Sequence, residues 1–166
     1  MSQLKPEHLW AGPLEPTSRA YAAAKLAGIE LCLAYRAQYE MPALVGIPAT
    51  VYGVAEEDDR EDGDLHVVAD LMRRMRQARE AGAGVFTVWG SGEPLREFIH
   101  VNDLADACDF LLNRCGQPPD PIINIGSGDE VSIRELAELI KRRVGFLGRL
   151  EFDRSQPDGA PRKLLD

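Results

Sequence analysis

The sequence predicts a protein of the α/β class. Segments with apolar residues at helical spacing alternate along the chain with short runs rich in valine, isoleucine and phenylalanine. Glycine and proline separate most of these segments, as expected of the turns that connect helices and strands. The chain has 166 residues, of which 45% are hydrophobic, so it is long enough to bury a core.

The first third of the chain is predicted to hold a long helix and a buried strand. Residues 1–17 are expected to be irregular because prolines interrupt them. Thr17 or Ser18 can cap a helix that reaches to about Glu40. The apolar stretch 43–53 then predicts one buried strand.

The middle of the chain begins with an acidic stretch, 54–64, that predicts a solvated loop. Asp64 can cap a helix over residues 65–81. The elements that follow are predicted as a short strand and turn over 85–94, a strand at 96–101, a helix from Asn102 or Asp103 to about Arg114, and a strand at 121–128.

The last predicted helix, over residues 133–144, has clear signals at both ends. Ser132 and Glu135 have the spacing of a capping box at its start, and Gly145 follows its end. A strand is predicted at 148–153. Residues 154–166, which contain several prolines and glycines, are expected to form a loop.

The charge balance argues against some classes of protein. The formal net charge is −8, whereas binding to nucleic acid needs clustered cations. No apolar run reaches membrane-spanning length, and the N-terminus has no apolar signal core, so we expect a cytoplasmic protein with no membrane partner. Three cysteines without a CxxC motif are expected to be small buried or half-buried side chains, and three histidines without ligand spacing give no reason to assign a metal.

Tyr21 and Lys25 lie four residues apart in the first predicted helix and therefore share a face of it. A cation near the ring favours the phenolate form of tyrosine. Such a tyrosine can pass a proton to or from the oxygen of a sugar or an alcohol. The alternative is a packed helix with one solvated lysine, and the pair by itself does not decide between the two.

Gly126 and Gly128, in the stretch INIGSGDEV, follow a predicted strand and precede a helix. This is the position of a phosphate-binding glycine loop, but Val131 occupies the place of the third glycine. Ser132 already explains the start of the helix. A tight turn is therefore the favoured interpretation.

Five stretches occur in one order along the chain: GPLEPTSRAYAAAKLAGIELCLAYRAQY, PATVYG, VWGSGEPLREFIHVNDLADA, INIGSGDEVSIRELAELI and PDGAPRKLLD. Together they resemble the GDP-L-fucose synthase family of extended short-chain dehydrogenases/reductases. The resemblance covers the later part of that family's chain and implies a partial Rossmann-like fold that lacks the N-terminal dinucleotide-binding half. It implies that residues 1–53 are the remnant of the cofactor domain, with the catalytic helix, and that residues 54–166 are mainly the substrate-binding domain.

The resemblance implies roles for the catalytic and cofactor-binding residues. Tyr21 corresponds to the catalytic acid/base, and Lys25 to the residue that assists it and binds the nicotinamide ribose of NADP. His66 corresponds to the acid used in epimerisation and is placed among the cofactor-binding residues as well. The stretch beside the nicotinamide matches Pro48, Ala49, Thr50 and Val51, where Ala49 and Thr50 replace a threonine and an asparagine of the family.

The substrate implied by the resemblance is a GDP-sugar, whose diphosphate requires cations. The residues that match the family's substrate contacts are Arg74, Trp89, Arg96, Asp158 and Lys163. Guanidinium groups suit bidentate contacts with phosphate. Each position also has a plain structural alternative, such as a solvated Arg74, a core Trp89, a strand-edge Arg96 or a surface His66.

Three functions remain open for the chain. It is part of an active synthase that works with its other half, a GDP-sugar-binding module without turnover, or a self-associating remnant without chemistry. We expect a homodimer, because the helix from Tyr21 to about Glu40 is apolar on more than one face. A monomer would leave that apolar surface in contact with water.

Overall fold

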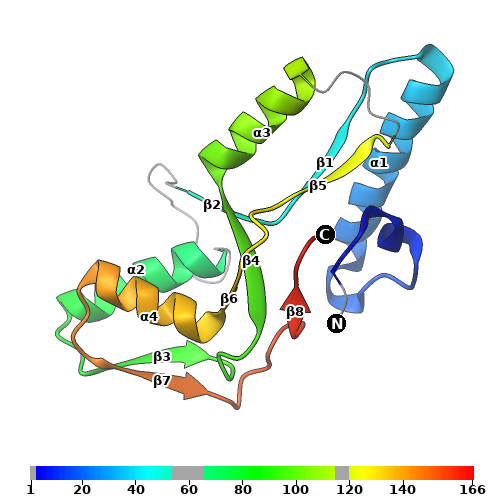
Figure 1. Ribbon diagram of the computed structural model, residues 1–166. Coiled ribbons are helices and arrows are strands. Elements are labelled where there is room, and N and C mark those ends of the chain that lie inside the picture. The colour runs from blue at the N-terminus through cyan, green and yellow to red at the C-terminus, as the bar shows by residue number, and fades with distance from the viewer. Residues whose placement is uncertain (1–2, 54–65, 115–119) are drawn as a thin grey trace.

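The computed structural model describes residues 3–53, 66–114 and 120–166 (Figure 1). The helices are α1 (Arg19–Tyr39), α2 (Val67–Glu80), α3 (Val101–Arg114) and α4 (Ile133–Val144), with short 3-10 turns η1 (Pro6–Trp10) and η2 (Pro16–Ser18). The strands are β1 (Val45–Pro48), β2 (Thr50–Tyr52), β3 (Val85–Trp89), β4 (Leu95–His100), β5 (Ile122–Ile125), β6 (Glu130–Ser132), β7 (Arg149–Asp153) and β8 (Arg162–Lys163). Helices and strands alternate and most strand pairs are parallel, which confirms the α/β prediction.

Strand β4 links the parts of the fold because it has three partners. Its last three residues pair in parallel with β2, from Thr50↔Phe98 to Tyr52↔His100. Its first residues pair antiparallel with β6 on one side and parallel with β8 on the other. The parallel pair β1–β5 lies above β4 in Figure 1, and the parallel pair β3–β7 lies below it.

The main hydrophobic core lies where α2 and α4 pack on the β3–β7 pair. Its buried residues are Leu71, Met75, Phe86, Val88, Leu136, Ala137, Ile140, Val144 and Phe146. The rings of Phe86 and Phe146 meet nearly edge to face, with centroids 6.2 Å apart. Full burial of one large apolar side chain stabilises a fold by about 1.5–3 kcal/mol. This cluster therefore fixes the positions of α2 and β3, which carry two of the predicted site residues.

Helix α1 lies apart from this core. None of its described residues is buried, and Leu31 is 60% exposed. Arg36 donates a hydrogen bond to the carbonyl of Ala43 at 3.2 Å and so ties the end of α1 to the chain that leads into β1. In Figure 1 the helix lies at the same end of the molecule as β1 and β5, away from α2 and α4. The apolar side chains of α1 consequently form an open surface.

The predicted strand over 43–53 is two strands in the structure. β1 pairs with β5 as far as Pro48, whereas β2 pairs with β4 from Thr50 onward. Between them, Ala49 donates its N–H to the carbonyl of Ile125 at 2.9 Å. Proline has no N–H to donate to a ladder, and the chain changes partner directly after Pro48.

Strands β6 and β8 were not predicted, and the prediction that residues 154–166 form a loop is wrong at β8. Both strands are too short to show a period of two in the sequence. They form because β4 offers a free edge on each side, to which β6 and β8 add their backbone hydrogen bonds. Leu4 makes a further bridge to Leu165, so the N-terminal and C-terminal segments run side by side.

Two smaller expectations also need revision. Helix α2 begins at Val67 with His66 as its N-cap, and Asp64 and the acidic stretch 54–64 lie outside the described residues. Cys32 is half-buried as expected, but Cys108 is exposed, because it lies on the outward face of α3. Cys115 lies outside the described residues.

Candidate functional site

The first turns of α1 carry Tyr21 and Lys25 as a pair. The Nζ atom of Lys25 lies 5.5 Å from the centre of the Tyr21 ring, as the spacing of four residues predicts. Tyr21 is 67% exposed, so its hydroxyl is open to a ligand. Among the described residues, neither side chain makes a hydrogen bond with another predicted site residue. The pair thus offers an ionisable hydroxyl beside a cation on an open surface.

A groove of about 770 Å³ lies between α2 and β3. Apolar core residues such as Leu71 and Val88 form part of its wall, and Trp89 lies at its edge. Trp89 is 65% exposed, which excludes the alternative that this ring belongs to the core. An exposed indole beside an apolar groove can stack on a flat group of a ligand.

The side chain of Arg74 forms part of the wall of this groove. Its guanidinium carbon lies 5.3 Å from the centre of the Trp89 ring and 5.2 Å from that of Phe86. Arg74 also donates to Oδ2 of Asp70 at 3.0 Å and to the carbonyl of Thr87 at 3.0 Å. The alternative of a solvated Arg74 is therefore wrong, because its cation lies against two aromatic rings and is paired with Asp70.

Arg96 and Lys163 are brought together by strand pairing. They are register partners in the parallel pair β4–β8, although they are far apart in the sequence. The Nη1 atom of Arg96 donates to the carbonyl of Leu95 at 2.7 Å. Burial lowers the pKa of the Arg96 guanidinium, whereas the negative charge of Asp158 acts in the opposite direction. Arginine remains charged at neutral pH in any case, so two cations lie side by side here.

Asp158 binds the turn that follows Trp89. Its Oδ1 accepts the backbone N–H of Ser91 at 2.9 Å, and its Oδ2 accepts the hydroxyl of Ser91 at 2.7 Å. These hydrogen bonds hold the pKa of Asp158 below its ordinary value. Gly90 has a φ of +84°, and a Cβ there would collide with the Asp158 carboxylate, so the turn requires glycine. Asp158 thereby joins the segment before β8 to the turn between Trp89 and Arg96.

His66 and residues 48–51 lie on other elements. His66 is exposed at the N-cap of α2, the helix that carries Arg74, and its side chain makes no capping hydrogen bond with the described residues. Residues 48–51 span the crossing from β1 to β2, next to the end of β5. The structure thus places the predicted residues in four groups: on α1, at the crossing from β1 to β2, on α2 and β3 around the groove, and at β4–β8 with Asp158.

Glu97 is a central residue that sequence reasoning missed. Its Oε1 accepts the N–H of Gly128 at 2.8 Å, so the Gly128 amide is hydrogen-bonded within the protein itself. The two glycines therefore lie in a bend bonded to Glu97, and this bend leads into strand β6 and not directly into the helix that the turn interpretation expects. The signal in the sequence was an acidic residue two positions before the buried Ile99, on the face of β4 where an apolar residue is expected.

Within the residues that the structure describes, no group of three or more histidine, cysteine, aspartate or glutamate side chains is placed to hold a metal ion. In the same residues, no helix combines the length and apolar character that crossing a membrane requires.

The parallel α/β fold, with the Tyr21–Lys25 pair exposed on α1, fits a protein of the short-chain dehydrogenase/reductase type. A family model described as the NAD dependent epimerase/dehydratase family matches residues 2–126, and the chain belongs to this family.

Relatives and solved structures give a finer comparison. "GDP-L-fucose synthase 1" and "Putative GDP-L-fucose synthase 2" of Arabidopsis thaliana are 52% and 51% identical to this chain over 95% of its length. The chain covers 48% and 47% of these two proteins, so it spans about half the length of the relatives it matches. A GDP-L-fucose synthetase from Naegleria fowleri bound to NADP matches 96% of this chain and half of its own, with a TM-score of 0.84 and 30% identity. The resemblance to GDP-L-fucose synthases and the expectation of a partial fold are confirmed.

Proposed function

We propose that this chain carries the sugar-nucleotide site and the proton-transfer pair of an NADP-dependent GDP-L-fucose synthase. In that family, GDP-4-keto-6-deoxy-mannose is epimerised at two ring carbons, and its ketone is then reduced. The names of the Arabidopsis relatives and the NADP in the Naegleria structure support this assignment. Because the chain spans about half of such a protein, we propose that turnover requires a dinucleotide-binding half as well.

The observation that carries the proposal is the pairing of Arg96 with Lys163 across β4 and β8. Like charges that face each other on neighbouring strands repel, and the charge of Asp158 near Arg96 offsets part of this repulsion. A diphosphate lying against both side chains removes this repulsion and accepts charge-assisted hydrogen bonds. The groove edge at Trp89 and Arg74 offers a stacking surface for the attached base. A nucleoside diphosphate therefore fits the groups that the structure provides.

The chemistry proposed for this chain lies in its proton-transfer groups. Tyr21 donates a proton to the ketone oxygen as the ketone is reduced, and Lys25 favours the phenolate that remains. His66 exchanges protons at the epimerised carbons. NADPH supplies the hydride when it is bound. The exposed pair on α1 fits a nicotinamide ribose, whereas the turn at 126–128 does not fit a pyrophosphate, because its Gly128 amide is bonded to Glu97.

Calorimetric titration of the purified chain with GDP tests the proposed site. We expect binding, and we expect Arg96→Ala to weaken it by about 1.5–3 kcal/mol, the range for a hydrogen bond to a charged group. The matched control is Arg149→Ala, which removes an exposed arginine paired with Glu151 on β7. The absence of any heat from GDP at millimolar concentration, or an equal loss in both variants, contradicts the proposal.

A GDP-sugar-binding module without turnover is the second candidate. It is favoured by the glycine turn, since the Gly128 amide is committed to Glu97. A titration with NADPH, together with an assay of ketone-dependent NADPH oxidation, distinguishes the two functions when both are run with the dinucleotide-binding half of a GDP-L-fucose synthase added to the chain. Oxidation that Tyr21→Phe abolishes supports the enzyme, whereas GDP binding without it supports the module.

We also propose that the chain acts as a homodimer in the cytoplasm. The open apolar surface of α1 supports self-association. The cysteines without a CxxC motif suit a reducing compartment.

A further inference from the structure

The buried carboxylate of Glu97 lies at the junction of three segments. Its residue is 3% exposed, which is unusual for a glutamate. Oε1 accepts the N–H of Gly128 at 2.8 Å, and Oε2 accepts the N–H of Leu165 at 2.9 Å. Burial of a carboxylate is costly unless hydrogen bonds compensate it. Both oxygens are compensated here by backbone donors, one from the turn after β5 and one from the C-terminal segment.

The glycine turn is shaped around this carboxylate. A Cβ at Gly126 would collide with Oε1 of Glu97, so any larger residue would displace the side chain. Gly128 has a φ of +79°, in the left-handed region that favours glycine. The two glycines that resemble a phosphate loop in the sequence therefore serve to receive Glu97.

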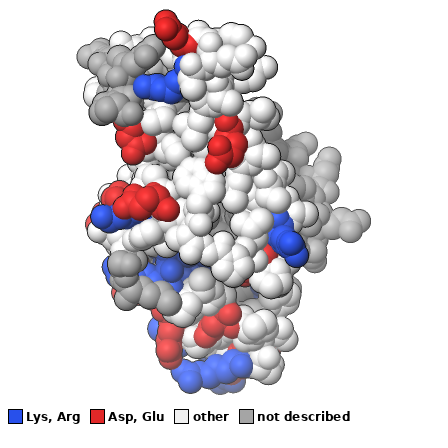
Figure 2. Space-filling model, turned by 90° about the vertical axis from the view of Figure 1, so that its right-hand side faces the viewer, with Lys and Arg blue, Asp and Glu red and all other residues white. Residues whose placement is uncertain are grey.

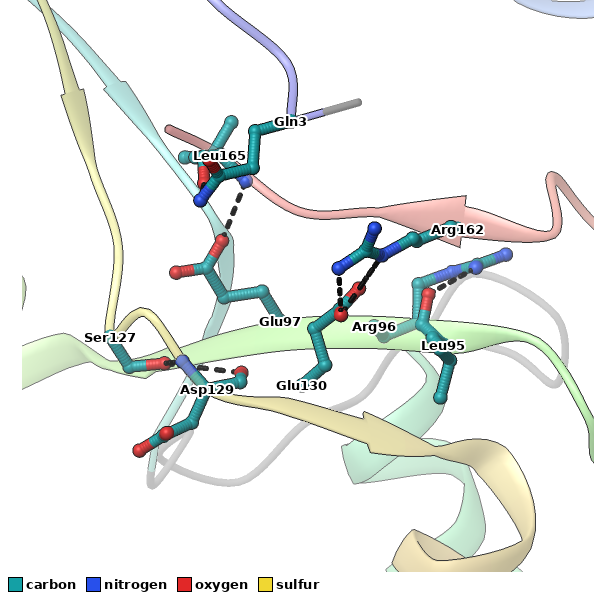
Figure 3. Close-up of polar contacts among 9 residues, drawn as sticks. All are labelled: Gln3, Leu95, Arg96, Glu97, Ser127, Asp129, Glu130, Arg162 and Leu165. Carbon is teal, nitrogen blue, oxygen red and sulfur yellow. Dashed lines mark hydrogen bonds and ion pairs between the residues drawn. The ribbon is translucent and has the colours of Figure 1, made fainter. Parts of the chain in front are cut away.

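The C-terminal segment is held in register by this junction together with the bridge between Leu4 and Leu165. β8 contains two residues, Arg162 and Lys163, and so short a strand has little stability of its own. Arg162 is held on one side by Glu130, through a contact at 2.6 Å. Leu165 is held two residues beyond Lys163 by Glu97 (Figure 3). Lys163 therefore lies between two anchors, each supplied by a carboxylate.

We infer that Glu97 is a positioning residue, which holds the C-terminal segment and the turn at 126–128 against β4 and so fixes Lys163 beside Arg96. Consecutive residues of a strand point to opposite faces. Glu97 therefore acts from the face of β4 opposite to Arg96, through the backbone of the C-terminal segment. The claim that Arg96 and Lys163 share a ligand rests on the proposed function, whereas the anchoring of the C-terminal segment by Glu97 does not.

The first test measures amide hydrogen exchange in the full chain. Glu97→Gln keeps the shape of the side chain but leaves one oxygen for two N–H donors. We expect the Leu165 or Gly128 amide to exchange at least about tenfold faster, as loss of a hydrogen bond to a charged group implies. The control is Glu151→Gln on β7, where the carboxylate is half-exposed and pairs with Arg149. Unchanged exchange at both amides in Glu97→Gln overturns the inference.

The second test is a double-mutant cycle for GDP affinity. We expect Glu97→Gln and Lys163→Ala to weaken binding by similar factors, and the double variant to be little weaker than either. Glu97→Gln and Arg96→Ala are expected to combine additively, because β2 and β6 continue to hold β4. Additivity with Lys163→Ala, or unchanged GDP affinity despite faster exchange, overturns the positioning role and leaves Glu97 with a structural one.

The inference can still be tested if Glu97→Gln does not fold, or if the unmodified chain binds no GDP. Leu165→Pro removes the N–H at the other end of the same hydrogen bond and replaces Glu97→Gln in the cycle if that variant does not fold. If the unmodified chain binds no GDP, the proposed function fails. Faster exchange in Glu97→Gln then still supports anchoring of the C-terminal segment, and unchanged exchange refutes it.

Discussion

Asp158 makes the fold sensitive to acid through its two hydrogen bonds from Ser91. These bonds hold its pKa below the ordinary value, so its contribution to stability is present above the pKa of the unfolded chain, about 3.9. The contribution is lost as the pH falls through the lower pKa of the folded state. We therefore expect Asp158→Asn to lower the melting temperature at pH 7, and this difference from the unmodified chain to shrink toward pH 3.

The control for this experiment is Asp129→Asn, since the Asp129 contacts with Ser127 use its backbone and not its carboxylate. Its melting temperature should follow that of the unmodified chain throughout. A gap between Asp158→Asn and the unmodified chain that stays constant from pH 7 to pH 3 would show that Asp158 contributes no pH-dependent stability.

Helix α4 shows how much one terminus contributes at the scale of an element. The hydroxyl of Ser132 accepts the N–H of Glu135 at 3.1 Å, and the Glu135 carboxylate accepts the N–H of Ser132 at 2.9 Å. Ser132→Ala removes one half of this capping box. We expect it to lower the free energy of unfolding in urea by about 1 kcal/mol, within the range of about 0.5–2 kcal/mol for such caps.

A matched substitution is available at the start of α1. Ser18 is the N-cap residue there, but its side chain makes no capping hydrogen bond with the described residues. Ser18→Ala should therefore change the free energy of unfolding by less than about 0.5 kcal/mol. An equal loss in both variants would mean that the capping box does not stabilise α4.

The whole molecule has its core at one end and an open apolar helix at the other. Leu31, Tyr35 and Tyr39 of α1 are 60%, 50% and 62% exposed. Figure 2 shows the side on which α1 lies in Figure 1, and much of that surface carries no charge. Soluble monomers rarely expose a contiguous apolar patch of this kind. We expect light scattering to give the mass of two chains, and Leu31→Glu to give the mass of one.

The control for association is Leu147→Glu, because Leu147 is 97% exposed in the loop after α4 and lies outside this surface. That variant should remain a dimer. If the unmodified chain has the mass of one chain at high concentration, or if both variants dissociate alike, the interface is not on α1.

The sequence by itself determined the features that depend on nearby residues. The capping box of α4 joins residues three apart, and the Tyr21–Lys25 pair joins residues four apart. Both follow from helix geometry, which fixes neighbours within one turn. The alternation of helices and strands, and hence the α/β class, follows from the period of the apolar residues. The sequence motifs also indicated Trp89 and Arg96 as candidate substrate-binding residues.

The tertiary structure alone decided which distant residues meet. Glu97 accepts hydrogen bonds from the N–H of Gly128, 31 residues away in the sequence, and from that of Leu165, 68 residues away. Asp158 accepts one from the N–H of Ser91, 67 residues away. β8 exists because β4 presents an edge to it, although its own two residues carry no strand signal. No local pattern encodes these contacts, since each depends on where separate elements pack. The register that places Lys163 against Arg96 is accordingly a property of the folded chain.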